Sequence, residues 1–220
     1  FSLSKNIKQE LIFKGVTALY KFYKLDRFSE DLDFSERNAV DINLLMKKIL
    51  NDLIKFRVES EITRIKEPFN SVLATFRTKG PLYNGNPQTL SNIRVDINRK
   101  SSVELEPDLL RFTSLYMEIP SFHVLVMKEE EILAEKIRAI ITRDKARDVY
   151  DLWFLINKGA VINKPLIKKK LRYYKKDFNG KEFKEKLEEK KSKWHIELDP
   201  LLNKVPDFNS VKKDILAMIG

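Results

Sequence analysis

Asp31 and Asp33 are the residues of this sequence whose type and spacing best suit chemistry. They stand two apart in the run SEDLDFSE, whose alternation of polar and apolar residues predicts a β-strand. Side chains two apart on a strand project from the same face, so both carboxylates could share one cation. Carboxylate oxygens suit magnesium, and two such ions could bridge a triphosphate and activate an attacking hydroxyl.

Asp96 is the best candidate for a third carboxylate. It lies in NIRVDINRK between apolar neighbours, where a charge is costly unless a metal or a partner compensates it. We therefore predict Asp31, Asp33 and Asp96 as metal ligands, with Asp96 also aiding deprotonation of the nucleophile. Exposed carboxylates are common on strands, so the D-x-D pair alone leaves a plain solvated strand as the alternative.

The segment before this pair predicts a phosphate site. LIFKG is a short apolar run that ends in Gly15, and TALYKFYK has apolar residues at helical spacing, which together indicate a strand, a tight turn and a helix. Backbone N–H groups and the positive end of the helix would face an anion bound at Gly15 and Thr17. The alternative is an ordinary turn with Thr17 as the helix N-cap.

The elements that must position these residues follow from periodicity. Apolar residues at helical spacing predict helices, and alternating or short apolar runs predict strands. Helices are expected at residues 40–56, 129–143 and 145–159, and further strands at 57–65, 71–79, 92–100 and 122–127. This order indicates an α+β fold, with an α/β core at residues 1–125 and a helical domain at residues 126–220.

Composition narrows the classes of function. The chain has 220 residues and no cysteine, which excludes disulfides and thiol catalysis and leaves any metal on oxygen ligands. It has no apolar run of the roughly 20 residues that span a bilayer, so we expect a cytoplasmic protein. The net charge is +10, and residues 161–220 hold 16 basic and 9 acidic side chains, which suits polyanions such as RNA or nucleoside triphosphates.

The run FKGVTALYKFYKLDRFSEDLDFS resembles the first motif of the AbiEii/AbiGii abortive-infection toxin nucleotidyltransferases, which are members of the DNA polymerase β-like superfamily. The family reads G-G-T-A-L and then R-x-S-x-D-x-D-F. The matching residues here are Gly15, Thr17, Ala18, Leu19, Arg27, Ser29, Asp31, Asp33 and Phe34. Val16 replaces the second glycine, and its β-branched side chain is expected to narrow the phosphate turn.

A second motif of the same family reads K-x-x-A-x-x-x-R-x-x-x-R-D-x-Y-D-L and resembles KIRAIITRDKARDVYDL in this chain. The matching residues are Lys136, Ala139, Arg143, Arg147, Asp148, Tyr150, Asp151 and Leu152. The resemblance implies that Lys136 contacts the triphosphate and that Asp148 or Asp151 supports or completes the active site. From the residues alone, Arg147 and Asp151 form an i,i+4 pair, and a solvated ladder of salt bridges is the alternative.

The resemblance spans about residues 11–157 and implies a minimal nucleotidyltransferase sheet, flanked by helices, with a helical C-terminal domain. It also implies that an NTP is the substrate, that magnesium is the cofactor, and that the nucleotide is bound by Gly15, Thr17, Arg27, Ser29, Lys136 and Arg143. The expected protein is the toxin of a toxin–antitoxin pair, with tRNA as a plausible acceptor and an antitoxin protein as partner.

Two other functions stay open on the sequence. The chain could be a catalytically degenerate member that binds RNA or a partner protein, or it could modify a protein hydroxyl. The lysine-rich segment 168–176, with Tyr173 and Tyr174 inside it, suits RNA phosphates and base stacking. A solvated helix face explains that segment equally well.

Overall fold

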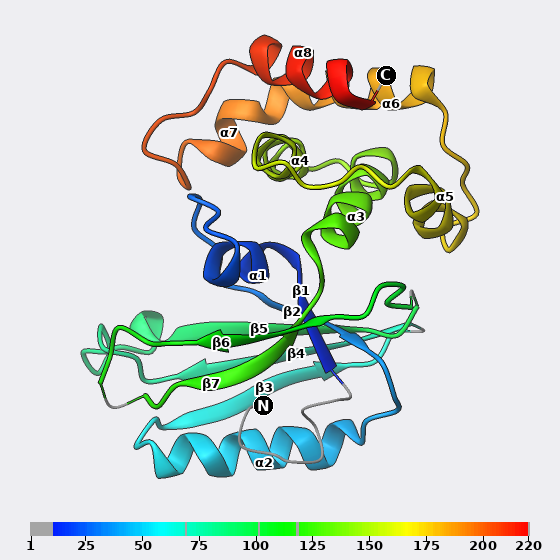
Figure 1. Ribbon diagram of the computed structural model, residues 1–220. Coiled ribbons are helices and arrows are strands. Elements are labelled where there is room, and N and C mark those ends of the chain that lie inside the picture. Colours follow the sequence, from blue (N-terminus) through cyan, green and yellow to red (C-terminus); the bar gives the residue numbers. More distant parts are fainter. Residues whose placement is uncertain (1–10, 69, 101, 118, 220) are drawn as a thin grey trace. The chain divides into compact units, whose positions relative to one another are not determined.

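The computed structural model describes residues 11–68, 70–100, 102–117 and 119–219 (Figure 1). In chain order the elements are β1 (Leu11–Lys14), α1 (Gly15–Phe22), β2 (Leu32–Glu36), α2 (Ile42–Lys55), β3 (Ser60–Lys66), β4 (Ser71–Thr78), η1 (Pro87–Thr89), β5 (Ser91–Asn98), β6 (Asp108–Phe112), β7 (Phe122–Val126), α3 (Glu129–Thr142), α4 (Arg147–Asn157), α5 (Lys164–Arg172), α6 (Gly180–Glu189), η2 (Lys190–Lys193), α7 (Trp194–Leu198) and α8 (Phe208–Ile219). The predicted α+β class is confirmed.

One mixed sheet of seven strands carries the first half of the chain. The strand order is β3-β4-β5-β2-β1-β7-β6, so β5, β2 and β1 lie at its centre. The pairs β2 with β5 and β1 with β7 are parallel, and the other neighbours are antiparallel. Strand β2, which carries Asp33, and strand β1, which leads into Gly15, are therefore internal and are paired on both sides.

Alternation along β4 separates the two faces of this sheet. Val72, Ala74 and Phe76 are buried at 0–2% exposure, whereas Leu73 is 39% exposed. Figure 1 shows α2 running along one face of the sheet. Asp41 is the N-cap of α2, and its side chain accepts a hydrogen bond from the backbone N–H of Leu44. The buried face is the one that faces α2, and the opposite face is the more polar one.

The chain divides into two compact units. The sheet unit takes in residues up to Ala18, Glu30–Val103 and Pro107–Val126, and the helical unit takes in Leu19–Ser29, Glu104–Glu106 and Met127 onward. Inside the helical unit, α4 packs against α3, α7 and α8 (Figure 1). Its core contains fully buried apolar side chains from several helices, namely Leu133, Ile137, Leu152, Leu155, Trp194 and Ile215.

Segments 19–29 and 104–106 belong to the helical unit because polar contacts attach them to it. The Tyr23 hydroxyl donates to the carbonyl oxygen of Met127 over 3.0 Å. The backbone N–H groups of Glu104 and Leu105 donate to the Glu131 carboxylate over 2.8 and 2.9 Å. Three-dimensional contacts of this kind leave no periodic signal in a sequence.

Three local expectations differ from the structure. The edge strand β6 was not expected, because Pro107 precedes it and because its five residues alternate only between half-buried and exposed. Asp31 precedes β2 instead of lying within it. Helix α1 begins at Gly15, so Thr17 lies inside the helix and is not its N-cap.

Candidate active site

Asp33 and Asp96 lie side by side on the polar face of the sheet. Strands β2 and β5 are parallel neighbours, and the Cα atoms of these two residues are register partners. Register partners share a face, and both side chains are half-buried. Together with Asp31 they line one cavity of about 350 Å³. The structure thus brings the three predicted carboxylates to a single cavity.

Asp31 already has a cationic neighbour. The Nε atom of Arg94 lies 2.9 Å from Oδ1 of Asp31, and the two side chains are 68% and 51% exposed. Arg94 comes from β5, two residues before Asp96 and on the same face. At this exposure the pair contributes little to stability, and the guanidinium neutralises one carboxylate of the cavity.

Gly15 follows β1 and begins α1, and its backbone lies next to the side chain of Asp33. Its φ of +71° is a left-handed conformation that favours glycine. A Cβ atom at this position would lie 2.9 Å from both Cβ and Cγ of Asp33, and nearer still to Oδ2. Only a glycine allows the carboxylate to lie this close to the turn. Val16, which replaces the family glycine, has no positive φ, so its own backbone is in a conformation that a β-branched residue adopts without strain.

The hydroxyl of Thr17 fixes the segment that carries the D-x-D motif. It is 3% exposed and donates a hydrogen bond to the backbone carbonyl oxygen of Asp31. The interpretation of Thr17 as an N-cap is therefore wrong, because the side chain bonds a residue 14 positions away instead of its own helix. Thr17 instead connects the phosphate turn to the carboxylate pair.

Sequence reasoning missed Lys14. It is the antiparallel register partner of Asp33, so both side chains lie on the same face, and it is only 7% exposed. A buried lysine needs a compensating charge, and the carboxylate face of the sheet is where this one lies. The available signal was a charged residue ending the apolar run LIFK, immediately before Gly15.

These residues fit a magnesium ion that substrate phosphates complete. Among the residues that the structure describes, no group of three or more acidic or histidine side chains forms a ready metal cage. Magnesium is usually held by one or two carboxylates together with phosphates and water. Asp33 and Asp96, with Asp31 beside them, supply hard oxygen donors of that kind.

The second motif forms a buried charge network in the helical unit. The ammonium of Lys136 lies 2.9 Å from Oδ1 of Asp148 and 2.7 Å from Oδ2 of Asp151. Arg27 bonds both oxygens of Asp151, at 2.6 and 2.9 Å. All four residues are at most 4% exposed. Arg27, from the first motif, and Lys136, from the second, thus converge on one carboxylate.

Arg143 extends this network, whereas Arg147 does not. The Arg143 guanidinium bonds Asp148 at 2.6 and 2.7 Å. Arg147 instead lies 3.7 Å from Glu197 of α7. The expected i,i+4 pair between Arg147 and Asp151 is therefore wrong, and so is the solvated ladder, because the two aspartates are buried.

Opposing effects set the pKa values in this network. Burial alone would raise the pKa of Asp148, but the charge of Lys136 and the bonds from Arg143 outweigh it, and the pKa is lowered. Burial likewise opposes ionisation of Asp151, and Lys136 and Arg27 reverse that effect, so its pKa is also lowered. Both aspartates are therefore ionised at neutral pH.

Ser29, which was predicted to bind the nucleotide, is half-buried and belongs to the helical unit.

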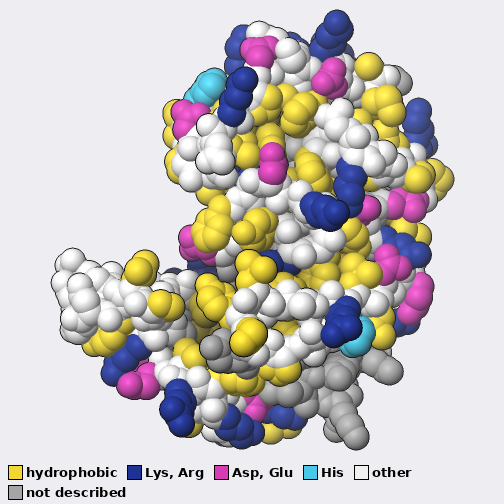
Figure 2. Space-filling view, turned by 60° about the vertical axis from the view of Figure 1, so that its left-hand side comes forward, with side chains coloured by type: hydrophobic (Ala, Val, Ile, Leu, Met, Phe, Trp, Pro, Cys, Tyr) yellow, Lys and Arg dark blue, Asp and Glu magenta, His cyan; other side chains and the backbone are white. Residues whose placement is uncertain are grey.

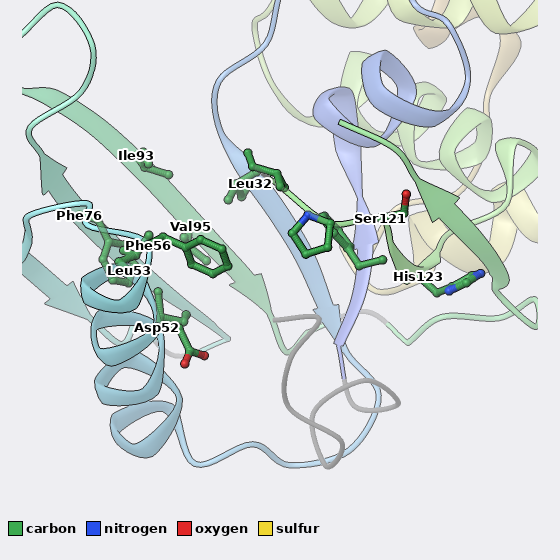
Figure 3. Close-up of a pocket in the computed structure, with 13 residues that line it drawn as sticks. Leu32, Asp52, Leu53, Phe56, Phe76, Ile93, Val95, Ser121 and His123 are labelled. Carbon is green, nitrogen blue, oxygen red and sulfur yellow. The ribbon is translucent and has the colours of Figure 1, made fainter. Parts of the chain in front are cut away.

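A larger cavity, of about 460 Å³, lies on the other face of the sheet (Figure 3). Leu32 and Val95 line it, and they alternate with the carboxylate residues along β2 and β5. Figure 3 shows Leu53, Phe56 and Phe76 on the same cavity. The predicted site residues do not line this cavity.

Only some side chains of the basic segment 168–176 are exposed to solvent. Lys170 is 1% exposed and lies 2.5 Å from Glu131, and the Tyr173 hydroxyl donates to Glu104 over 2.7 Å. Tyr174 packs under Arg138. Figure 2 shows lysine and arginine side chains distributed over the visible face with acidic side chains among them. The two tyrosines therefore have intramolecular roles.

Comparisons with known proteins agree with the motifs. The family model described as "Nucleotidyl transferase AbiEii toxin, Type IV TA system" matches residues 4–215. No curated protein matches the chain. Within the described residues, no helix is long and apolar enough to cross a membrane.

Solved structures share the fold. JHP933 from Helicobacter pylori is 22% identical with a TM-score of 0.59, and the match covers 97% of this chain and 84% of that one. A putative nucleotidyltransferase from H. pylori is 23% identical with a TM-score of 0.60, covering 97% and 87%. MenT4, a nucleotidyltransferase toxin from Mycobacterium tuberculosis H37Rv, is 19% identical with a TM-score of 0.65, covering 97% and 75%.

Proposed function

The chain belongs to the AbiEii nucleotidyl transferase toxin family, and we propose that it transfers a nucleoside monophosphate from an NTP to an acceptor hydroxyl at the Asp33–Asp96 pair. One observation carries this proposal. The two carboxylates are register partners on neighbouring parallel strands, and one of them lies against the glycine turn that opens α1. Carboxylates beside a turn that can bind phosphate could hold magnesium on a triphosphate, which is the chemistry that nucleotidyl transfer uses.

The donor side of the site is the turn at Gly15. The first N–H groups of α1 have no partner within the helix, and the positive end of the helix dipole favours an anion there. Thr17 keeps the turn and the D-x-D segment together through its bond to Asp31. We assign the triphosphate of the NTP to this turn.

The transfer itself is a displacement at the α-phosphorus. The acceptor oxygen forms a bond to that phosphorus, the bond to the β-phosphate oxygen breaks, and pyrophosphate leaves. Asp96 accepts the proton of the attacking hydroxyl. Magnesium bound by Asp33 and Asp96, with Asp31, would supply activation of the hydroxyl and neutralisation of the leaving group's charge.

We propose RNA, with tRNA as the first example to test, as the acceptor, and a cognate antitoxin protein as the partner. The net charge of +10 favours a polyanionic acceptor over a protein. The matched family is described as part of a type IV toxin–antitoxin system, which motivates the antitoxin. The roles of Lys136, Arg143, Asp148 and Asp151 in the reaction stay predictions from the family resemblance.

The direct test supplies each of the four α-labelled NTPs in turn, with magnesium, to the protein with total tRNA or with cell protein. Label on tRNA that disappears on chelation of magnesium would support the proposal and identify the nucleotide. Label on protein alone would contradict the RNA acceptor. Absence of label from both acceptors, with NTP binding intact, would contradict transfer and favour a degenerate binding protein.

A further inference from the structure

Two cations on β3 share a cavity with the carboxylates. Arg64 and Lys66 line the same cavity of about 350 Å³ as Asp33 and Asp96. Both are exposed. Neither residue was singled out from the sequence, where β3 reads as an ordinary polar strand.

A β-bulge puts these cations on the polar face. The register of β3 with β4 shifts between Ile62 and Arg64. Before the shift Ile62 opposes the buried Phe76, and after it Arg64 opposes Thr75, which faces the other way. Without the extra residue Arg64 would oppose the buried Ala74. Bulges often re-aim side chains beside active sites, and this one aims Arg64 and Lys66 toward the carboxylate face.

Cross-strand register aligns the cations with the site. Lys66 opposes Leu73 of β4, and Leu73 in turn opposes Asp96 of β5. Two strand spacings separate Lys66 from Asp96, which is roughly 10 Å. Leu73, the residue between them in this row, is uncharged.

Three other cations near this part of the sheet have carboxylate partners. Arg77 lies 3.7 Å from Glu61, Lys79 pairs with Glu59 at 2.5 Å, and Arg94 pairs with Asp31. Within the described ranges, Arg64 and Lys66 form no ion pair. Their charge is therefore available to an anionic ligand.

The order of the strands indicates that this anionic ligand is the acceptor and not the NTP. Gly15 follows β1 and the cations lie on β3, so the two sites flank the carboxylate strands on opposite sides. With the donor triphosphate at Gly15, the side beyond Asp96 receives the nucleophile. We propose that Arg64 and Lys66 bind the phosphate backbone of the acceptor strand and thereby direct its hydroxyl to Asp96. This inference rests on the proposed function.

The test compares two matched double variants in the full-length chain. Arg64→Glu with Lys66→Glu reverses both cations, and Arg172→Glu with Lys168→Glu reverses one arginine and one lysine on the exposed surface of α5. Each is made in the active chain and in an Asp33→Asn background. The measurements are tRNA binding by the Asp33→Asn forms, and the KM for tRNA and for NTP in the active forms. A neutral variant, Arg64→Gln with Lys66→Gln, controls for repulsion.

We expect the β3 reversal to weaken tRNA binding and raise the KM for tRNA by roughly tenfold or more, with the KM for NTP unchanged. The slope of log affinity against log salt should decrease by about 1.4 in the Gln variant, about 0.7 for each lost single-strand contact. The α5 reversal alters segment 168–176, the rival RNA surface that the sequence offers, and on this inference it should leave all three quantities near wild type.

Two results would overturn the inference. A raised KM for NTP with unchanged tRNA binding would assign the cations to the triphosphate, and a defect confined to the α5 variant would place the acceptor on the helical unit. Binding by the Asp33→Asn forms needs no turnover, so it tests this inference even if no transfer is found. Near-identical melting temperatures establish that each variant is folded.

Discussion

The carboxylate of Asp33 lies against the Cα atom of Gly15, so that any side chain at position 15 would collide with it. A Cβ atom there would be 2.9 Å from Cβ and Cγ of Asp33. Gly15 also has a φ of +71°. Two independent constraints therefore require glycine at the position where β1 meets α1 beside Asp33.

Replacing Gly15 by alanine should abolish transfer beyond its effect on stability. The strained φ should cost about 1 kcal/mol or more, and the collision should displace the carboxylate of Asp33. The matched control is Gly159→Ala, because Gly159 has a φ of +89° with nothing within 4 Å of its Cβ position. Urea unfolding and initial rates are compared for both. Equal losses of activity in the two variants would contradict the role given to Gly15.

Asp151→Asn should strongly destabilise the protein. Its carboxylate is fully buried between Lys136 and Arg27, and removing one partner leaves two buried cations undercompensated. We expect a loss of about 3–5 kcal/mol in the free energy of unfolding. The control Asp199→Asn removes an exposed pair with His195 and should leave the urea midpoint near wild type. Similar midpoints for the two variants would show that the buried network contributes little.

Acid should destabilise the folded protein through the same network. The folded-state pKa values of Asp148 and Asp151 are lowered, whereas an unfolded aspartate titrates near about 3.9. The unfolded chain binds more protons below that pH, so the stabilisation is present above about pH 5 and is lost as pH falls further. Urea unfolding between pH 3 and 7 measures this. An Asp148→Asn variant should show a flatter profile, and a profile parallel to wild type would contradict the assignment.

Arg94→Gln should lower the magnesium concentration needed for half-maximal transfer. Arg94 neutralises Asp31, and an exposed pair is worth at most about 1 kcal/mol, so the expected decrease is up to roughly fivefold. Arg77→Gln, which breaks an exposed pair on the same face, serves as control. Rates are measured at saturating NTP across a magnesium titration. An increased magnesium requirement would mean that Arg94 assists binding of the metal complex instead of competing with it.

Local signals predicted most of the sheet unit. Alternation of polar and apolar residues predicted β2, β4 and β5. Residues two apart on a strand share a face, and Asp31 and Asp33 do line one cavity, together with Asp96. The edge strand β6 was missed because an edge strand buries too little to leave a strong pattern. The bulge that aims Arg64 outward is a register effect between two strands, which a single strand's sequence does not contain.

The second motif shows what sequence reasoning could not supply. Spacing suggested that Arg147 and Asp151 pair along one helix. In the structure Asp151 instead forms ion pairs with Arg27, a residue 124 positions away, and with Lys136 from the preceding helix. Burial decides this, because a fully buried carboxylate must be compensated by whichever cations the tertiary fold brings to it.

The most direct measurement of the central claim is the initial rate of label transfer from α-labelled NTP by Asp33→Asn and Asp96→Asn beside the wild type and Asp52→Asn. Asp52 lies on α2 and lines the cavity on the opposite face of the sheet. We predict that the first two variants lose at least about a hundredfold in rate while remaining folded, and that Asp52→Asn transfers at the wild-type rate. Wild-type transfer by either Asp33→Asn or Asp96→Asn would contradict the assignment of the reaction to this pair.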